Sequence, residues 1–271
     1  MIFASDLDQT LIYSRNFLSK HYANPAEAIE NDLRIIEYYQ GEPLSYIHND
    51  VVEHLQKLDS LGLFVPVTTR TEEQYKRIDF GKMGIKPQYA ITTNGAKVLK
   101  DGKVDKNWES LIHTKLKQVS PQAEEISDLI HASIRKEVIK KIRVAENTFT
   151  YCVLFRELLQ DDELQALSAS FAKEEWSISL QGTKLYFMPS VISKANAMGY
   201  VCQQLNLDHY IAAGDSLLDM PLLMEAKQGI IPEHGEIYDQ QLHLKHALIS
   251  SQQKGINASL AIIKHAIEAI K

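Results

Sequence analysis

The chain has 271 residues, of which 45% are hydrophobic and 24% are charged, and its formal net charge is −6. These values are ordinary for a soluble globular protein, and no apolar run approaches the roughly 18 residues that a membrane span requires. The acidic balance and the lack of a basic stretch argue against nucleic acid as a partner. The N-terminus lacks the pattern of a signal peptide, so we expect a cytoplasmic protein with no membrane partner.

Short apolar strands alternate with amphipathic helices in the first part of the chain, which predicts an α/β fold with a parallel sheet. The expected elements, in chain order, are a strand at residues 1–5, a hairpin at 33–47, a helix from Asn49 to about residue 61, a strand at 63–67, a helix at 72–80 and a strand at 89–92. The hairpin from Leu33 to Ile47 is either a surface feature or a flap over a site, and the sequence leaves both open.

A different pattern begins near residue 96. The expected elements there are a hairpin at 97–104, helices at 108–119 and 121–134, strands at 138–146 and 149–156, a helix at 162–173, and a second hairpin with strands at 177–180 and 184–188. Paired strands with helices are typical of an α+β domain. The first pattern then returns, with strands at 210–213, 229–231 and 247–250 and helices beginning near Ser193, Pro221 and Asn257.

We therefore predict two domains. Residues 1–95 and 189–271 form a Rossmann-like parallel sheet with helices on both faces, and residues 96–188 form an inserted α+β domain.

Two pairs of aspartates follow apolar strands that are far apart in the sequence. Asp6 and Asp8 lie in DLDQT after the first strand, and Asp215 and Asp219 lie in GDSLLD after the strand at 210–213. The carboxyl ends of parallel strands are where such folds place ligands, and neighbouring carboxylates repel one another unless a cation lies between them. A solvated loop would explain the first pair alone, and a helix N-terminal charge would explain Asp219 alone. Together the two pairs suggest a Mg²⁺ site, since this ion prefers oxygen ligands.

Two further side chains could bind an anion. Thr68, in VPVTTR after the second strand, offers a hydroxyl group, although a helix cap is the better explanation when this residue is taken alone. Lys194, in SVISKANAM, begins a predicted helix, where a positive charge is mildly unfavourable with the helix dipole. That unfavourable placement favours a functional role over a solvated surface lysine.

In this order, DLDQT, Thr68, Lys194 and the Asp215/Asp219 pair resemble the four motifs of the haloacid dehalogenase superfamily of hydrolases. The position of the insert, between the second and third motifs, resembles the branch with a large α/β cap, which includes the Cof-like and sucrose-phosphate phosphatases. The TTNGA segment at the entry to the insert also resembles that branch. Three residues depart from the usual pattern without removing a catalytic group, and they leave the substrate group open: Gln9, Thr69 and Leu218.

The resemblance implies a Mg²⁺-dependent phosphatase. Asp6 would attack phosphorus to form an aspartyl-phosphate, and Asp8 would act as general acid and then general base. The Asp6 and Asp215 carboxylates and the backbone carbonyl of Asp8 would bind Mg²⁺, with Asp219 orienting or completing that shell. If so, the carboxyl groups of Asp6 and Asp215 must lie within about 10 Å of each other. The expected substrate-binding residues are Thr68, Arg70, Asn94, Gly95 and Lys194.

The substrate implied by the resemblance is a small phosphorylated metabolite, with sugar phosphates as the leading class, and the cap would exclude water and select the leaving group. One alternative is a phosphotransferase or phosphomutase on the same scaffold. Another is a non-catalytic phospho-aspartate regulatory module, which fits less well because the candidate nucleophile ends the first strand. A dehalogenase is also less expected, because Asp8 supplies a general acid that carbon–halogen cleavage does not need.

Overall fold

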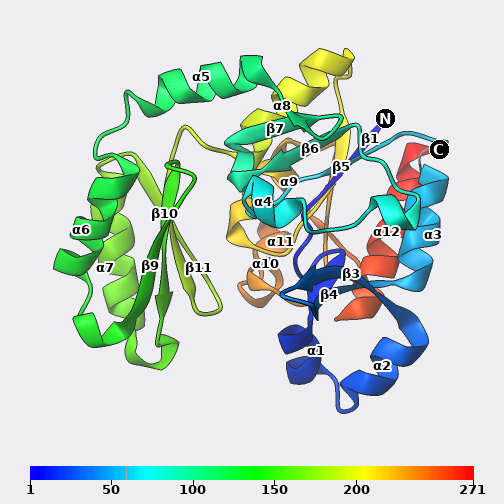
Figure 1. The fold of residues 1–271 in the computed structure, drawn as a ribbon, viewed down its shortest axis with the longest axis horizontal. Coiled ribbons are helices and arrows are strands. Elements are labelled where there is room, and N and C mark those ends of the chain that lie inside the picture. Colours follow the sequence, from blue (N-terminus) through cyan, green and yellow to red (C-terminus); the bar gives the residue numbers. More distant parts are fainter. Residues whose placement is uncertain (59) are drawn as a thin grey trace. The chain divides into compact units, whose positions relative to one another are not determined.

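A computed structural model describes residues 1–58 and 60–271, which form two compact units (Figure 1). Unit 1 comprises Met1–Asp105 and Lys194–Lys271, and unit 2 comprises Lys106–Ser193. The first boundary falls ten residues after the predicted one, because the hairpin of β7 (Lys97–Lys100) and β8 (Lys103–Val104) pairs with β6 (Tyr89–Thr92) of unit 1. Across the described ranges, no helix combines the length and the apolarity that crossing a membrane would need.

Unit 1 is built on a five-stranded parallel sheet with the strand order β15-β14-β13-β1-β5. The strands are β1 (Ile2–Ser5), β5 (Leu63–Pro66), β13 (Tyr210–Ala213), β14 (Gln228–Ile231) and β15 (Ile249–Ser250). Every residue of β1 and β13 is buried, as expected for strands that are covered on both faces. Because Ser5 pairs with both Ala213 and Pro66, the loops that follow β13, β1 and β5 leave the sheet side by side.

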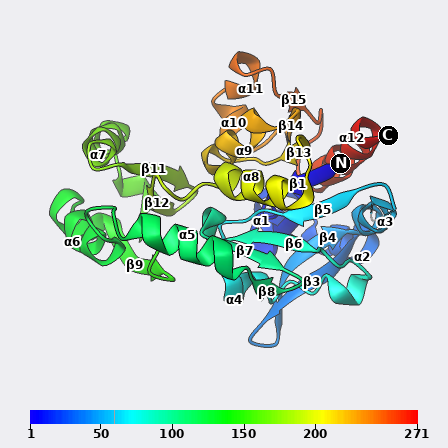
Figure 2. The same ribbon diagram turned by 90° about the horizontal axis from the view of Figure 1, so that it is seen from above.

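Helices cover both faces of this sheet, which confirms the predicted fold class. On one face, α3 (Asn49–Leu58) and α12 (Ile256–Ile270) lie side by side, and their apolar side chains pack with Phe3 and Phe64 of the sheet (Figure 1). On the other face lie α8 (Lys194–Leu205) and α9 (Met220–Glu225) (Figure 2). Helix α3 was predicted to reach residue 61, but it ends at Leu58, and residue 59 lies outside the described part of the chain.

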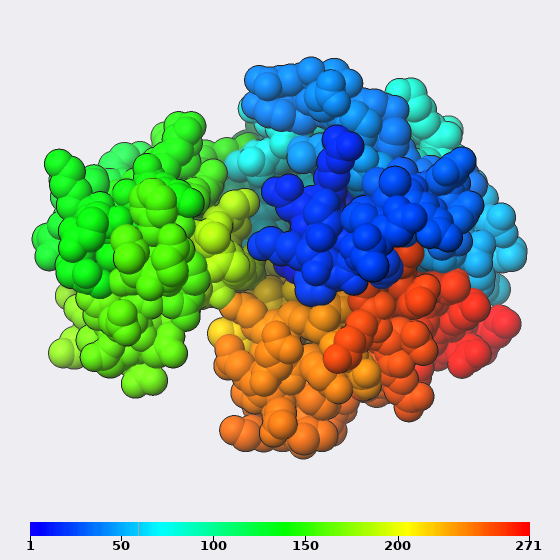
Figure 3. Space-filling view, turned by 90° about the horizontal axis from the view of Figure 1, so that it is seen from below, coloured from blue at the N-terminus to red at the C-terminus, as the bar shows by residue number. Residues whose placement is uncertain are grey.

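The segment between β1 and α3 forms a small antiparallel sheet of its own, with the strand order β2-β4-β3. Its elements are β2 (Ile12–Ser14), α1 (Arg15–His21), α2 (Pro25–Asp32), β3 (Leu33–Tyr39) and β4 (Glu42–His48), of which the sequence predicted only the β3–β4 hairpin. Tyr13, Phe17 and Leu18 pack against Ile256, and the blue surface of this segment accordingly lies beside the red surface of α12 in Figure 3. The segment is therefore part of unit 1 rather than a detached arm.

Unit 2 is an α+β domain around a four-stranded antiparallel sheet with the order β11-β12-β10-β9. Its elements are α5 (Lys106–Leu116), α6 (Ala123–Ser133), β9 (Ile139–Ala145), β10 (Phe149–Leu154), α7 (Asp161–Ala172), β11 (Trp176–Gln181) and β12 (Lys184–Pro189). Apolar side chains of α6 and α7 pack with the sheet around Trp176 and Phe187. The paired strands and helices of this unit agree with the α+β fold predicted for the insert.

The described part of unit 1 also contains the short α-helices α4 (Glu72–Tyr75), α10 (Glu236–Asp239) and α11 (Leu242–Lys245). Helix α4 was expected to continue to residue 80, but the chain turns away after Tyr75. The following residues pair with β3 instead, through an isolated bridge between Ile78 and Glu37 and a hydrogen bond from the Asp79 N–H to the Ile36 carbonyl of 2.9 Å.

Candidate active site

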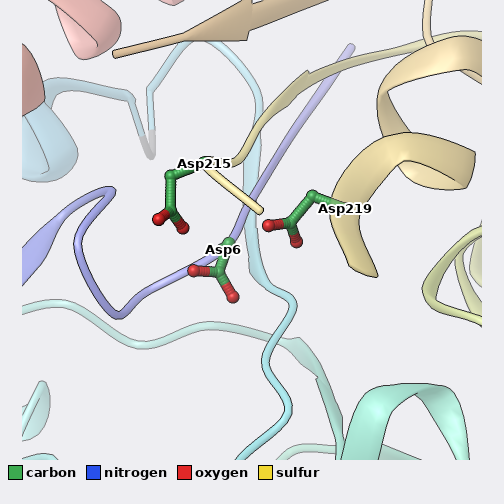
Figure 4. A group of neighbouring side chains, drawn as sticks. All are labelled: Asp6, Asp215 and Asp219. Atoms are coloured by element: carbon green, nitrogen blue, oxygen red, sulfur yellow. The ribbon is translucent and has the colours of Figure 1, made fainter. Parts of the chain in front are cut away.

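Three aspartates from two neighbouring strand ends converge in unit 1. Asp6 follows β1, and its N–H donates to the carbonyl of Ala213 at the end of β13 over 2.9 Å. Asp215 and Asp219 follow β13, and one carboxylate oxygen from each of the three aspartates lies within 4.8 Å of the others (Figure 4). The three side chains point toward one another and are buried. This separation is well inside the limit of about 10 Å that a shared ion requires.

A glycine and a serine hold Asp219 against the loop that carries Asp215. A Cβ atom on Gly214 would lie 2.5 Å from Cβ and Cγ of Asp219, so only glycine allows this approach. The backbone N–H and the hydroxyl group of Ser216 donate to Oδ2 of Asp219 over 3.0 and 2.7 Å. One Asp219 oxygen is thereby fixed, and the other faces Lys194.

Lys194 lies at the start of α8 with only 1% of its surface exposed. Its Nζ atom donates to Oδ1 of Asp6 over 2.7 Å and to Oδ1 of Asp219 over 2.5 Å. Burial alone would lower the pKa of Lys194, but the carboxylates of Asp219 and Asp6 raise the pKa above its ordinary value. The side chain therefore carries a permanent positive charge between two of the three carboxylates.

The electrostatics of this cluster fit a divalent cation. Burial raises the pKa of Asp6 to about 7, because Lys194 offsets only part of the effect of burial, and Asp219 and Asp8 raise the pKa further. Burial also raises the pKa of Asp215 well above its ordinary value, with contributions from Asp6 and Asp219. Three ionised carboxylates and one ammonium group sum to a charge of −2, which a single Mg²⁺ ion would balance. The donor set also consists of the oxygen ligands that Mg²⁺ prefers.

Asp8 lies outside this three-carboxylate group and pairs with Arg70 instead. The Nε and Nη2 atoms of Arg70 donate to Oδ2 and Oδ1 of Asp8 over 2.7 and 2.8 Å, a two-point contact that fixes the plane of the carboxylate. The third guanidinium nitrogen, Nη1, donates to Glu37 over 2.8 Å. Arg70 was predicted to bind substrate, but in this structure its nitrogens contact Asp8 and residues of the β3–β4 hairpin.

The contact between Arg70 and the buried residue Glu37 was not predicted. Glu37 of β3 is 1% exposed and also accepts hydrogen bonds from Arg77 over 3.1 Å and from the Ser45 hydroxyl over 2.6 Å. The available signal was an acidic residue in a largely apolar strand, RIIEYY, whose nearest basic residue, Arg34, lies three positions away and so on the opposite face of a regular strand. A buried carboxylate requires compensating charge, so such a residue points to a distant cation.

The remaining predicted residues lie beside Arg70 at the ends of β5 and β6. Thr68 is fully buried, and its hydroxyl oxygen accepts the Arg70 N–H over 3.1 Å. The Asn94 N–H donates to the carbonyl of Thr68 over 3.0 Å, and the backbone of Asn94 and Gly95 is left-handed. The side-chain oxygen of Asn94 is buried and has no hydrogen-bond partner among the described residues. Thr68, Asn94 and Gly95 thus belong to the same loop cluster as the Asp8–Arg70 pair.

Comparison with known proteins identifies the family. Residues 47–270, well over half of the chain, match the model of the sucrose-6F-phosphate phosphohydrolase family. The chain belongs to this family. The predicted membership of the haloacid dehalogenase superfamily, in the branch with the Cof-like and sucrose-phosphate phosphatases, is confirmed. The matched region begins after Asp6 and Asp8, so the first motif and the β2–β4 segment lie almost entirely outside the match. No curated protein sequence matches the chain.

Several solved structures share the fold of this family member, and each aligns with nearly the whole chain. The sucrose-phosphatase from Synechocystis sp. PCC6803, solved with sucrose and phosphate, shares 16% identity with a TM-score of 0.66 over 98% of this chain and 97% of that one. A haloacid dehalogenase-like hydrolase from Bacillus subtilis shares 17% identity, with a TM-score of 0.56 over 97% and 99%. BT1666 from Bacteroides thetaiotaomicron, a phosphatase of the same superfamily, shares 13% identity, with a TM-score of 0.56 over 100% and 95%. At these identities the likeness establishes the fold alone.

Proposed function

We propose that this member of the sucrose-phosphate phosphohydrolase family is a Mg²⁺-dependent phosphatase that hydrolyses a sugar phosphate through an aspartyl-phosphate on Asp6. The observation that carries the proposal is the convergence of Asp6, Asp215 and Asp219 at the carboxyl end of the sheet, with the Lys194 ammonium group bonded to Asp6 and Asp219. The substrate class is supported by the family match and by the sucrose and phosphate bound to the Synechocystis protein.

The carboxylates of Asp6, Asp215 and Asp219 would hold the Mg²⁺ ion, together with the backbone carbonyl of Asp8. When bound, the ion would neutralise the repulsion between carboxylate and phosphate and stabilise charge in the transition state. Lys194 contributes to the same end, because its ammonium group favours the ionised form of Asp6, which is the form that can act as a nucleophile.

In the first step, a carboxylate oxygen of Asp6 attacks phosphorus, and the bond between phosphorus and the sugar oxygen breaks. Asp8 donates a proton to that leaving oxygen, because an unprotonated sugar alkoxide is a poor leaving group. In the second step, Asp8 accepts a proton from a water molecule that attacks phosphorus, and the Asp6–phosphorus bond breaks to release phosphate. Lys194 and the Thr68 hydroxyl would bind the phosphoryl oxygens during both steps.

The test is phosphate release from a panel of phosphorylated metabolites, with Mg²⁺ and with EDTA. The panel includes sucrose 6F-phosphate, hexose phosphates and nucleotides. We expect Mg²⁺-dependent release from at least one sugar phosphate by the wild-type protein and by Asp208→Asn, a control at an exposed aspartate. Asp6→Asn should lose at least about a thousandfold in kcat, because it removes the nucleophile.

Undiminished hydrolysis by Asp6→Asn would contradict the proposed mechanism. Transfer of phosphate to an added sugar, in place of release, would identify the protein as a phosphotransferase. No turnover of any ester would favour a regulatory module.

A further inference from the structure

Glu37 is placed by an irregularity in its strand. The pairing of β3 with β4 shifts on both sides of Glu37, between Ile35 and Glu37 and between Glu37 and Tyr38. A regular strand would bury alternate side chains, but Ile36 and Glu37 are adjacent and both are buried. Bulges of this kind turn a side chain toward a new direction and are frequent beside active sites. Here the bulge directs a carboxylate, rather than an apolar group, into the interior of unit 1.

The buried carboxylate of Glu37 is connected to Asp8 through a single side chain. Arg70 donates from Nη1 to Oε2 of Glu37 over 2.8 Å and, with its other two nitrogens, to both oxygens of Asp8. Ser45 donates to the same Oε2 atom over 2.6 Å, and Arg77 donates to Oε1 over 3.1 Å. Two guanidinium groups and two carboxylates thus balance in charge, and each oxygen of Glu37 has a donor.

This arrangement limits how the Arg70 side chain can move. The guanidinium group is planar and is held at both ends, by a buried carboxylate on one side and by Asp8 on the other. The side chain of Asp8 is 42% exposed, whereas that of Glu37 is fully buried. Glu37 is therefore the buried end of this chain of contacts, and Asp8 is the end that solvent reaches.

We propose that Glu37 is a positioning residue for the acid–base step: it fixes Arg70, and Arg70 orients Asp8. When Asp8 acts as the acid, one of its oxygens carries the proton for the leaving group in place of an Arg70 contact, and the other oxygen keeps its contact with Arg70. The inference rests on the proposed function and goes beyond it, because Glu37 belongs to the segment that precedes the matched family region. In this chain, the small β2–β4–β3 sheet thus contributes to catalysis through a side chain that does not touch the substrate.

The choice of substrate separates this role from a purely structural one. A sugar phosphate needs its leaving oxygen protonated, whereas p-nitrophenolate leaves readily without a proton. Loss of Asp8 positioning should therefore slow hydrolysis of the sugar phosphate and leave hydrolysis of p-nitrophenyl phosphate nearly unchanged. General loosening of the site should slow both substrates equally.

The experiment compares Glu37→Gln with Glu73→Gln under Mg²⁺. Glu73 is a matched control, because it is 4.0 Å from the same Arg77 but its side chain is 90% exposed. For Glu37→Gln we expect kcat on the sugar phosphate to fall about tenfold, a fraction of what a general acid usually contributes. We also expect KM to stay within about twofold, and kcat on p-nitrophenyl phosphate to change by less than about twofold. Glu73→Gln should match the wild-type protein on both substrates.

A second comparison uses Asp8→Asn. If Glu37 acts through Asp8, adding Glu37→Gln to Asp8→Asn should produce no further loss on the sugar phosphate. Ser45→Ala removes one hydrogen-bond donor to Glu37. It should lower kcat on the sugar phosphate less than Glu37→Gln does, and should likewise spare p-nitrophenyl phosphate. This variant replaces Glu37→Gln in the test if circular dichroism shows that Glu37→Gln does not fold.

An equal loss on both substrates, or a full additional loss in the Asp8→Asn background, would overturn the positioning role. If the wild-type protein is active and Glu37→Gln behaves like Glu73→Gln, only this inference fails. If the wild-type protein hydrolyses neither substrate, the proposed function fails with it.

Discussion

The stability of the protein should respond to Mg²⁺ in a pH-dependent way, and the structure fixes the sign of that dependence. Burial raises the pKa of Asp6 from an ordinary value of 3.8 to about 7 in the absence of a metal ion. Between these values the folded protein holds a proton that the unfolded chain has released. Through Asp6, the free energy of unfolding of the cation-free protein should therefore fall as the pH rises from about 4 to 7. Asp215, whose pKa is also raised, acts in the same direction.

The size of this change in unfolding free energy follows from the raised pKa of Asp6. A difference of about three pKa units corresponds to about 4 kcal/mol for one group. Saturation with Mg²⁺ at about 100 times its dissociation constant would add about 2.7 kcal/mol. In a unit of this size, each kcal/mol moves Tm by about 2–4 °C. We therefore expect Mg²⁺ to raise Tm by about 5–10 °C at pH 8, where Asp6 is ionised, and by about half of that or less at pH 5.

Differential scanning calorimetry is the suitable assay, because it follows the unfolding of unit 1 itself, whereas Trp108 and Trp176, the two tryptophans of the chain, both lie in unit 2. The matched variants are Asp215→Asn, which removes a proposed ligand, and Asp208→Asn, which changes an exposed aspartate. The Mg²⁺ effect should be largely lost in the first and kept in the second. A Tm gain as large at pH 5 as at pH 8, or a full gain in Asp215→Asn, would refute the reasoning.

Three further outcomes can be measured directly. Lys194→Met should lower the free energy of unfolding by about 3–5 kcal/mol in urea titrations, because it leaves two buried carboxylates without their cation, and should abolish phosphate release. Gly214→Ala should destabilise the protein by about 1–3 kcal/mol and weaken Mg²⁺ binding in calorimetric titrations, because the new methyl group displaces Asp219. Its control is Gly199→Ala, which should be neutral or stabilising, because the new methyl group there would meet open space on a helix. Tyr22→Phe should cost about 1–2 kcal/mol in the same urea titrations with unchanged kcat, because its hydroxyl accepts the first N–H of α12 over 2.7 Å.

Much of unit 1 could be predicted because its signals are local. The strands β1 and β13 are short apolar runs that end at aspartates, and α3 has buried residues at helical spacing after Asn49. The convergence of Asp6 and Asp215 could be predicted for the same reason, since both follow strands and the order of strands in a parallel sheet brings such loops together. Asp219 follows Asp215 by one turn and joins the same group. The unfavourable position of Lys194 at a helix start marked it as a candidate, and the structure places its ammonium group against Asp6 and Asp219.

The remaining features depend on contacts that the sequence does not display. The helix predicted to reach residue 80 ends at Tyr75, because Ile78 pairs with β3 across about 40 positions of the chain. Helix α2 has no buried residue, so it lacks the apolar periodicity by which helices are recognised, although Asn24 and Pro25 mark its start. Glu37 is buried through a bulge, and a bulge breaks the alternation from which burial is inferred.

The order of the strands also bears on how the protein assembles as it leaves the ribosome. The residues of unit 2 are contiguous, so this unit can fold as soon as it has been synthesised. Strand β1 is synthesised well before its neighbour β13, which follows about 200 residues later. The nascent chain must therefore carry a strand that is fully buried in the folded protein, with one unpaired edge, while those residues are synthesised. Mutations that slow the pairing of β1 with β13 should lower the yield of native protein even where the finished enzyme tolerates them.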